Sequence, residues 1–154
     1  MAAKFSQLIE YRDIEMSDLD TIYDLETKSY NFPWTRNILK DCIINRYDSF
    51  AAMYSNNIVG YVISKISSIE SHILNLTVDE KYRNNGIGSE LLDMVINKCQ
   101  IVQSEILLLE TRLTNDSAIF LYEKGALKKR GVRKSYDKTA LGKEDAIVGR
   151  KTVS

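Results

Sequence analysis

The chain has few of the residues that build metal centres or disulfide frameworks. Its 154 residues include one histidine and two cysteines. A single histidine cannot supply the repeated Cys/His spacing of a zinc site, so we expect no metal. Cys42 and Cys99 each lie beside apolar residues in a helical pattern, which predicts two reduced, buried thiols. The N-terminus lacks a long apolar run, so we expect no signal peptide, no membrane span and a cytoplasmic protein.

Net charge is also absent, because 21 basic residues balance 21 acidic ones. A general nucleic-acid binder usually has a basic excess, so we expect no nucleic-acid partner. A local basic cluster over residues 128–138 is interpreted as a solvated surface hairpin. There is one proline and no linker or repeat. Residues 1–154 therefore predict a single domain, long enough for a hydrophobic core.

The periodicity of apolar residues predicts alternating strands and helices. Strands are expected at 8–14, 49–54, 58–66, 70–78, 105–111, 126–132 and 145–152, and helices at 18–29, 35–46, 86–100 and 115–124. Ser17 with Asp20 predicts the N-cap of the first helix, and Thr35 that of the second. Asn56-Asn57 predicts a hairpin turn.

A basic, glycine-bearing turn between a strand and an amphipathic helix is the most informative segment. Gly86 and Gly88 let the backbone approach a ligand closely, and the first N–H groups of the following helix would face an anion. Arg83 and Lys81 add positive charge nearby. An ordinary strand-to-helix turn is the simpler interpretation, but the flanking elements favour a pyrophosphate site. The pattern Arg-x-x-Gly-x-Gly is neither a P-loop nor the dinucleotide fingerprint.

This turn resembles the acetyl-CoA pyrophosphate loop of the Gcn5-related N-acetyltransferase (GNAT) family. Four further segments match in order: Phe32-Pro33-Trp34, Leu109-Glu110-Thr111, the run from Asn115 to Glu123, and Glu144 to Ile147. Together they resemble the peptide Nα-acetyltransferases, and the resemblance covers nearly the whole chain. It implies an α/β (α+β) fold with a central mixed, mostly antiparallel, twisted sheet. That sheet would splay at the acetyl-CoA site and carry helices on both faces.

The resemblance implies direct transfer of acetyl from acetyl-CoA to the N-terminal α-amine of a protein or peptide, in a ternary complex. A ribosomal protein is one candidate partner. About a tenth of an α-amine is neutral at pH 7, whereas a lysine is almost fully charged, so a modest base suffices. A GNAT enzyme acting on a small amine, which would favour an acidic pocket, and a non-catalytic acyl-CoA-binding module are the alternatives. The oligomeric state stays open.

Three side chains are candidates for proton transfer. Glu110 follows an apolar strand, where a carboxylate is out of pattern, and bacterial relatives place their base there; a solvated strand end is the alternative. His72 is the only histidine and has a free pKa near 6.5. Archaeal relatives carry a histidine there and use it through water, although a structural histidine is an equal alternative. Tyr122 would donate a proton to the departing thiolate, unless it is a core aromatic.

The resemblance also implies the binding residues. Those for acetyl-CoA are Leu76, Val78, Arg83, Asn84, Asn85, Gly86, Ile87, Gly88, Ser89, Asn115 and Tyr122. The backbone N–H of Val78 would polarise the acetyl carbonyl if the neighbouring strand splays away. Those for the peptide are Tyr30, Phe32, Trp34 and Tyr136, where aromatic rings would pack on its first residues. A hydrophobic plug at the helix junction is the alternative for Phe32 and Trp34. Lys28 replaces a glutamate of many relatives, so the preferred first residue does not carry over.

Overall fold

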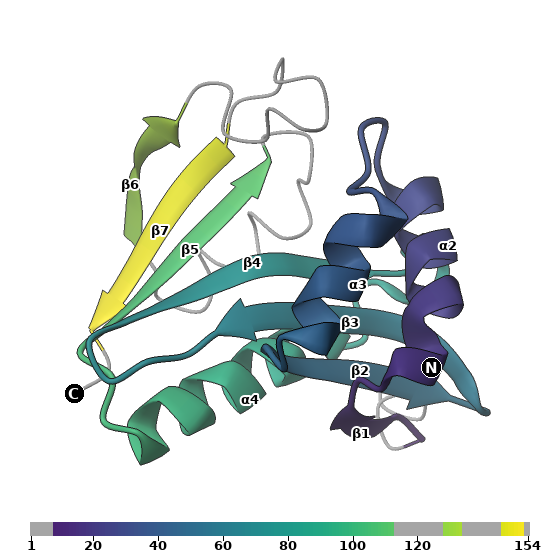
Figure 1. Cartoon of the computed structure of the whole chain (residues 1–154), viewed down its shortest axis with the longest axis horizontal. Helices are drawn as coiled ribbons and strands as arrows, with labels where there is room; N and C mark the ends of the chain where they lie inside the picture. Colours follow the sequence, from purple (N-terminus) through teal and green to yellow (C-terminus); the bar gives the residue numbers. More distant parts are fainter. Residues whose placement is uncertain (1–7, 113–127, 134–145, 153–154) are drawn as a thin grey trace.

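The computed structural model describes residues 8–112, 128–133 and 146–152. Their strands form one seven-stranded sheet in the order β1-β2-β3-β4-β5-β7-β6 (Figure 1). The strands are β1 Glu10–Asp13, β2 Asp48–Tyr54, β3 Asn57–Lys65, β4 Glu70–Val78, β5 Ile106–Arg112, β6 Lys128–Arg133 and β7 Ala146–Thr152. Strands β4 and β5 are parallel, and every other neighbouring pair is antiparallel.

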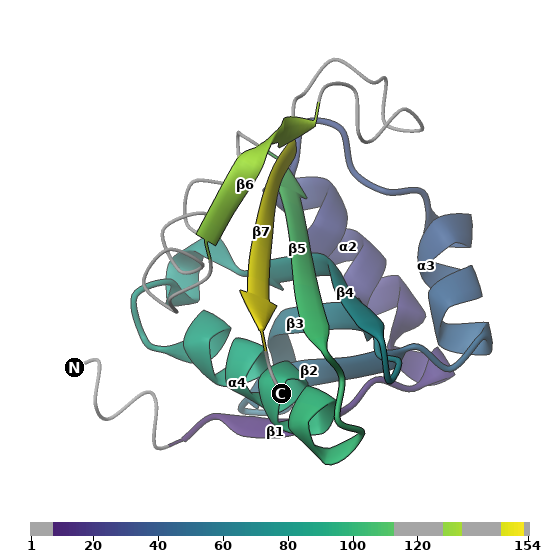
Figure 2. The ribbon, with the colours of Figure 1, turned by 90° about the vertical axis from the view of Figure 1, so that its left-hand side faces the viewer.

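Helices cover both faces of this sheet. Helices α2 (Leu19–Ser29) and α3 (Arg36–Ile44) lie on one face, and α4 (Ile87–Ile101) lies on the other (Figure 2). Two short 3-10 turns, η1 (Met16–Asp18) and η2 (Glu80–Tyr82), precede α2 and α4. The predicted fold class is therefore confirmed, and so is the predicted order of the described elements. The helix predicted at 115–124 lies outside the described residues.

Two apolar layers hold the helices to the sheet. Ile87, Leu91 and Val95 of α4 pack in one cluster with Val62 and Leu76 of the sheet. On the opposite face, the buried side chains of α2 and α3 cluster with those of β2 and β3, including Ile22, Leu25, Leu39, Ala51 and Tyr61. Along each strand, successive side chains point alternately into these two layers, as strand geometry requires.

The predicted thiols and helix caps can be compared with the structure. Cys42 and Cys99 are free and buried, as predicted, and burial with the nearby Asp41 raises the pKa of Cys42 to about 11. Thr35 caps α3 by accepting the N–H of Ile38 at 3.2 Å, as predicted.

The predicted N-cap of the first helix is wrong, although its predicted start at residue 18 is only one residue from that of α2. A 3-10 turn, η1, precedes α2, and its capping box joins Glu15 and Asp18. Asp18 accepts the N–H of Glu15 at 2.8 Å and also receives two bonds from Arg12 of β1, at 2.7 and 2.8 Å. The capping carboxylate is therefore that of Asp18, because a guanidinium on the neighbouring strand fixes it there.

The predicted hairpin turn is displaced by one residue. Ser55 and Asn56 have positive φ values of 50° and 66°, and Asn57 already begins β3. Two-residue hairpin loops of the commonest type need positive φ at both central positions. Ser55 therefore takes the place predicted for an asparagine.

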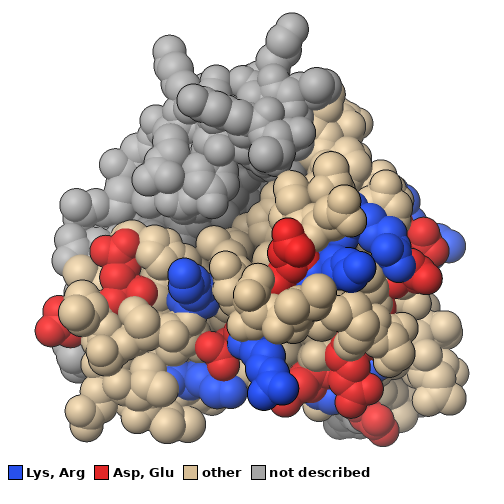
Figure 3. Space-filling view, viewed as in Figure 1, with Lys and Arg blue, Asp and Glu red and all other residues tan. Residues whose placement is uncertain are grey.

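Charges of both signs lie side by side on the face of the molecule shown in Figure 3. No helix in the described ranges is both long and apolar enough to cross a membrane.

Candidate active site where β4 and β5 part

Strands β4 and β5 pair only at their beginnings. The parallel register joins Glu70–Ile73 to Ile106–Leu109, but β4 continues to Val78 and β5 to Arg112. Figure 1 shows the two strands starting together and then diverging. We call the paired stretch the closed end of β4 and residues 75–78 its open end. The sheet therefore splays, as predicted.

A bulge in β4 lies where the parting begins. On the β3 side, Ile63 pairs with Asn75 and Ser64 pairs with Ile73, so Leu74 is an extra residue on β4. A bulge bends its strand and increases the local twist. Leu74 follows directly after Ile73, the last β4 residue that pairs with β5. The bend at the bulge thus coincides with the point where β4 and β5 part.

At the open end of β4, the backbone N–H of Val78 points toward the edge of the strand that is not paired with β5. The N–H of Asp79 donates to the carbonyl of Val59 in β3 at 2.8 Å. Consecutive N–H groups along a strand point to opposite edges, so the N–H of Val78 points away from β3. The carbonyl of Val78 accepts a bond from Arg83 Nε at 3.2 Å. The N–H and the carbonyl of Val78 therefore both face the edge away from β3.

The turn after β4 presents the start of α4 to this edge. Asn84 and Gly86 have positive φ values of 66° and 79°. Glu90 donates to the carbonyl of Gly86 at 3.0 Å, which leaves the N–H groups at positions 87–89 without a carbonyl in their own helix. A Cβ on Gly86 would meet no described heavy atom within 4 Å, so glycine is needed for its φ and not for lack of room. Such a helix start fits an anion such as pyrophosphate.

Asp79 and Asn85 fix the shape of this turn. Asn85 Nδ2 donates to the carbonyls of Tyr82 and Arg83 at 3.0 and 3.1 Å. Asp79 accepts the N–H of Lys81 at 3.0 Å and lies 3.1 Å from Lys28 Nζ of α2. Burial disfavours the ionised form of Asp79, but these two partners outweigh burial and lower its pKa. The loop is therefore tied both to itself and to α2.

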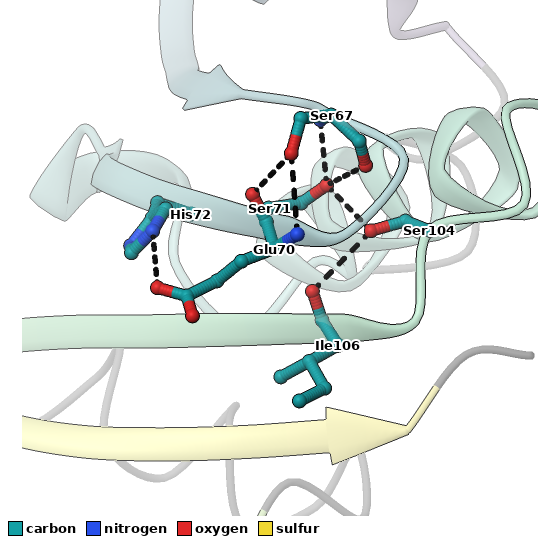
Figure 4. A network of polar contacts seen from close by, with 6 residues as sticks. All are labelled: Ser67, Glu70, Ser71, His72, Ser104 and Ile106. Atoms are coloured by element: carbon teal, nitrogen blue, oxygen red, sulfur yellow. Dashed lines mark hydrogen bonds and ion pairs between the residues drawn. The ribbon is translucent and has the colours of Figure 1, made fainter.

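His72 and Glu110 lie on adjacent strands near the parting. His72 pairs with Leu108, and Glu110 follows two residues later in β5, in register with Val148 of β7. The His72 side chain is 30% exposed, and its Nε2 lies 2.9 Å from Glu70 Oε1 (Figure 4). The sequence analysis missed Glu70. Its spacing of two residues from His72 in a strand was the available signal, since such residues share a face.

Serine side chains secure the closed end. Ser71 Oγ lies 2.8 Å from Ser104 Oγ, which donates to the carbonyl of Ile106 at 3.3 Å (Figure 4). Ser67 Oγ donates to the carbonyl of Glu70 at 2.6 Å and accepts its N–H at 3.2 Å. Together with the bonds between Ser67 and Ser71, these contacts join the turn before β4, the start of β4 and the turn before β5.

Of the predicted peptide-binding residues, the described ones lie in the 30–34 segment between α2 and α3. The Tyr30 hydroxyl lies 2.8 Å from Thr77 Oγ1 and 3.3 Å from the carbonyl of Leu76. Trp34 and Phe32 are both half-buried, and Trp34 packs partly against the core under α2 and α3. The predicted residues Asn115, Tyr122 and Tyr136 lie outside the described residues.

Glu26 of α2 is a residue whose role the sequence analysis missed. Its side chain is fully buried, and it accepts bonds from Trp34 N, Asn75 Nδ2 and the Tyr61 hydroxyl. The signal was its position, because Glu26 shares the apolar stripe of Ile22 and Leu25. A carboxylate on a buried stripe needs donors close by.

A surface pocket of about 210 Å³ lies elsewhere, at the start of β2. Its lining includes Arg46, Asp48 and Lys98 but none of the predicted site residues. In the described ranges, no group of three or more His, Cys, Asp and Glu side chains is arranged to hold a metal ion. The parting of β4 and β5 therefore remains the candidate site.

Known proteins share this arrangement. The ribosomal protein bS18-alanine N-acetyltransferase of Escherichia coli is 30% identical over 135 residues, which cover 88% of this chain and 91% of the relative. A crystal structure of the ribosomal-protein-S18-alanine N-acetyltransferase from Escherichia coli superposes with a TM-score of 0.81 at 28% identity, covering 95% of this chain and 94% of that one. Ard1 from Thermoplasma volcanium shares the fold, with a TM-score of 0.83 at 23% identity and coverage of 96% and 99%.

The model of the acetyltransferase (GNAT) family matches residues 16–126. This match identifies the family. The splayed sheet, the helix start that suits a pyrophosphate and the similarity to the Escherichia coli enzyme agree with it, and they identify acetyl-CoA as the acetyl donor. The chain belongs to the acetyltransferase (GNAT) family and is an acetyl-CoA-dependent N-acetyltransferase.

Proposed function

We propose that this enzyme acetylates the N-terminal α-amine of a protein or peptide, by direct attack in a ternary complex. The parting of β4 and β5 beside His72 carries the proposal, because it leaves a backbone edge between the pyrophosphate turn and a candidate base. The Escherichia coli relative, named for acetylating an alanine of a ribosomal protein, supports a protein N-terminus as the acceptor. A ribosomal protein is therefore a candidate substrate here too.

The chain's own backbone groups would bind the donor and stabilise developing charge. The N–H groups at 87–89 and the Arg83 side chain would hold the pyrophosphate, with Asn84 and Asn85 shaping the turn. Val78 N–H would donate to the acetyl oxygen as it becomes anionic. Leu76 would add main-chain contacts along the same strand. Asn115 is proposed to meet the pantetheine arm.

Proton handling would fall to His72, Glu110 and Tyr122. An Nε2–H of His72 donated to Glu70 leaves Nδ1 as an acceptor for the amine proton, directly or through water. Glu110 would share that water from the neighbouring strand. Tyr122 would donate its proton to the departing thiolate. A modest base suffices for the amine, because part of an α-amine is already neutral at pH 7.

Tyr30, Phe32, Trp34 and Tyr136 are proposed to line the peptide groove, and residues 1–154 to act as one domain. A small amine such as a polyamine is the second candidate acceptor, and it would favour an acidic pocket. Residues 30–34 contain no acidic side chain. In the part of α2 just before them, Glu26 is fully buried and Lys28 is basic. A binding module without turnover would need none of the proton-handling groups.

Two matched peptides test the proposal. Both contain one internal lysine and begin with alanine, and one has its α-amine blocked. With acetyl-CoA, the free peptide should release thiol and acquire one acetyl group at its N-terminus by mass spectrometry. The blocked peptide and a polyamine should give little turnover. Acetylation of the lysine alone, or faster turnover of the polyamine, would contradict the proposal.

A further inference from the structure

A carboxylate is buried between α2 and the open end of β4, and the proposed reaction does not use it. Glu26 Oε2 accepts the backbone N–H of Trp34 at 2.8 Å, and Oε1 accepts Asn75 Nδ2 at 2.9 Å. The hydroxyl of Tyr61 also donates to Oε1. Four parts of the fold therefore meet at this side chain: α2, the 30–34 segment, β3 and β4.

The burial of Glu26 has to be compensated. Its exposed fraction is 0%, and in the described ranges it has no ion pair. A buried carboxylate is tolerated only where hydrogen bonds replace its hydration. All three of its partners are donors, which matches a group that only accepts. Burial and the negative charge of Glu26 also raise the pKa of Tyr61 well above its usual value, so Tyr61 remains a donor.

A directed chain of hydrogen bonds runs from Glu26 along β4 to Tyr30. Asn75 donates to Glu26 and accepts the hydroxyl proton of Thr77 at 2.8 Å. Thr77 gives its one hydroxyl proton to Asn75, so Tyr30 is the donor in its 2.8 Å contact with Thr77 Oγ1, and the same Tyr30 proton also faces the carbonyl of Leu76 at 3.3 Å. The bonds given by Asn75 and Thr77 both point toward Glu26. The carboxylate thereby orders side chains from Asn75 to Tyr30.

We propose that Glu26 is a positioning residue that holds the 30–34 segment against the open end of β4. It does so at two points, through the Trp34 N–H and through the chain that ends at Tyr30. The proposal rests on the proposed function for its kinetic consequence, since that function places the peptide groove on this segment. Losing the carboxylate should weaken peptide binding and leave the acetyl-CoA turn unchanged, because none of the bonds found for the turn among the described residues involves Glu26.

Glu26→Gln is the test variant, because it keeps the shape and turns one acceptor into a donor. We expect the KM for the free peptide to rise roughly 10-fold or more, with the KM for acetyl-CoA within about 2-fold. Asp20→Asn is the matched control: it lies on the same helix, is 80% exposed and pairs with Arg36 at 2.8 Å. It should change neither constant. The double variant Glu26→Gln/Asn75→Asp returns a carboxylate to the cluster and should recover part of the loss.

A readout that needs no turnover separates this proposal from the proposed function. The chain has one tryptophan, Trp34, so its fluorescence reports on the segment. Acrylamide should quench Trp34 more strongly in Glu26→Gln than in the wild type or in Asp20→Asn. If the wild type acetylates no peptide, the proposed function fails, and quenching alone then decides whether Glu26 holds the segment.

Thr77→Val serves if Glu26→Gln does not fold. It removes one hydroxyl and nearly preserves the volume, so it breaks the chain to Tyr30 and leaves the three donors of Glu26 in place. Its peptide KM should rise by a few fold, and its quenching should increase. Equal losses for peptide and acetyl-CoA, or unchanged quenching together with unchanged peptide KM, would overturn the proposal in either variant.

Discussion

The two ends of β4 are held in different ways. At the closed end, Glu70–Ile73 pair with β5, and serine hydroxyls fasten the turn before the strand. At the open end β4 no longer pairs with β5. Side chains of α2 (Glu26 and Lys28) and of the 30–34 segment (Tyr30) hold β4 and the residue after it instead. Because these contacts come from the face of the sheet, they leave the edge of the strand to the proposed substrates. A splayed sheet can thus be held in place at the proposed binding site.

The largest effect should come from the turn beyond the open end. Gly86→Asp places a carboxylate beside the N–H groups at 87–89 and forces a side chain into a φ of 79°. We expect acetyl-CoA affinity to fall by on the order of 100-fold or more, by calorimetry. Gly86→Ala is the control for backbone strain and should lose roughly 10-fold or less. Unchanged affinity in Gly86→Asp would remove the turn from the site.

The proton-handling pair at the parting should give the next effect. His72→Phe and Glu110→Gln should each lower kcat by on the order of 100-fold, with acetyl-CoA affinity nearly intact. Raising the pH should restore part of the rate, because bulk water can then deprotonate the amine.

Two further variants sharpen that experiment. The double variant should be little worse than the poorer single, since groups acting on one water are not additive. Tyr122→Phe should be slow at every pH, because it affects thiolate departure. Full activity of both His72→Phe and Glu110→Gln at neutral pH would mean that alignment alone drives transfer.

The serine contacts of the closed end should affect stability and not catalysis. Ser104→Ala removes the 2.8 Å contact between Ser104 Oγ and Ser71 Oγ, while Ser71 Oγ keeps its two 3.1 Å bonds to the backbone of Ser67. Because no buried group is left without a partner, we expect a loss of roughly 0.5–1.5 kcal/mol in urea unfolding. The KM values for both substrates should stay at wild-type levels. A rise in the peptide KM as large as that of Glu26→Gln would remove the distinction between the two ends.

The smallest expected effect is on the pH dependence of stability, through the carboxylate of Asp79. The pKa of Asp79 is lowered in the folded enzyme from its usual 3.8, so its ties to Lys81 and Lys28 stabilise the fold at neutral pH. That contribution is lost as the pH falls below about 4 and the carboxylate becomes protonated. Asp79→Asn should therefore lower stability at pH 7 by about 1 kcal/mol or less, since Lys28 is 58% exposed, and should change it little at pH 3. An equal loss at both values would contradict this.

Local pattern was enough to locate β4, but not to show how its ends differ. The range 70–78 was predicted to the residue, because alternation and the glycine turn delimit it. The bulge at Leu74 could not be predicted, since it exists only as a mismatch between β3 and β4. The splay was expected only from the family resemblance.

The buried carboxylate shows the same limit. Its place on the apolar stripe of α2 was visible in the sequence, but Asn75, its partner in β4, lies 49 residues away. No spacing rule links an α-helix to a strand at that distance. His72 and Glu110 were identified from residue type and family resemblance. Glu70 was missed because, in the sequence, a carboxylate at the start of a strand cannot be told from an ordinary solvated surface residue.

Amide exchange by NMR, with and without acetyl-CoA, tests most directly whether the open end of β4 binds the donor. Acetyl-CoA should slow amide exchange at Val78, whose N–H faces the edge of β4 that is not paired with β5, and at positions 87–89, whose N–H groups lie at the start of α4. Exchange at Glu70–Ile73, already paired with β5, should not change. Protection confined to the closed end, or no change at Val78, would contradict the account.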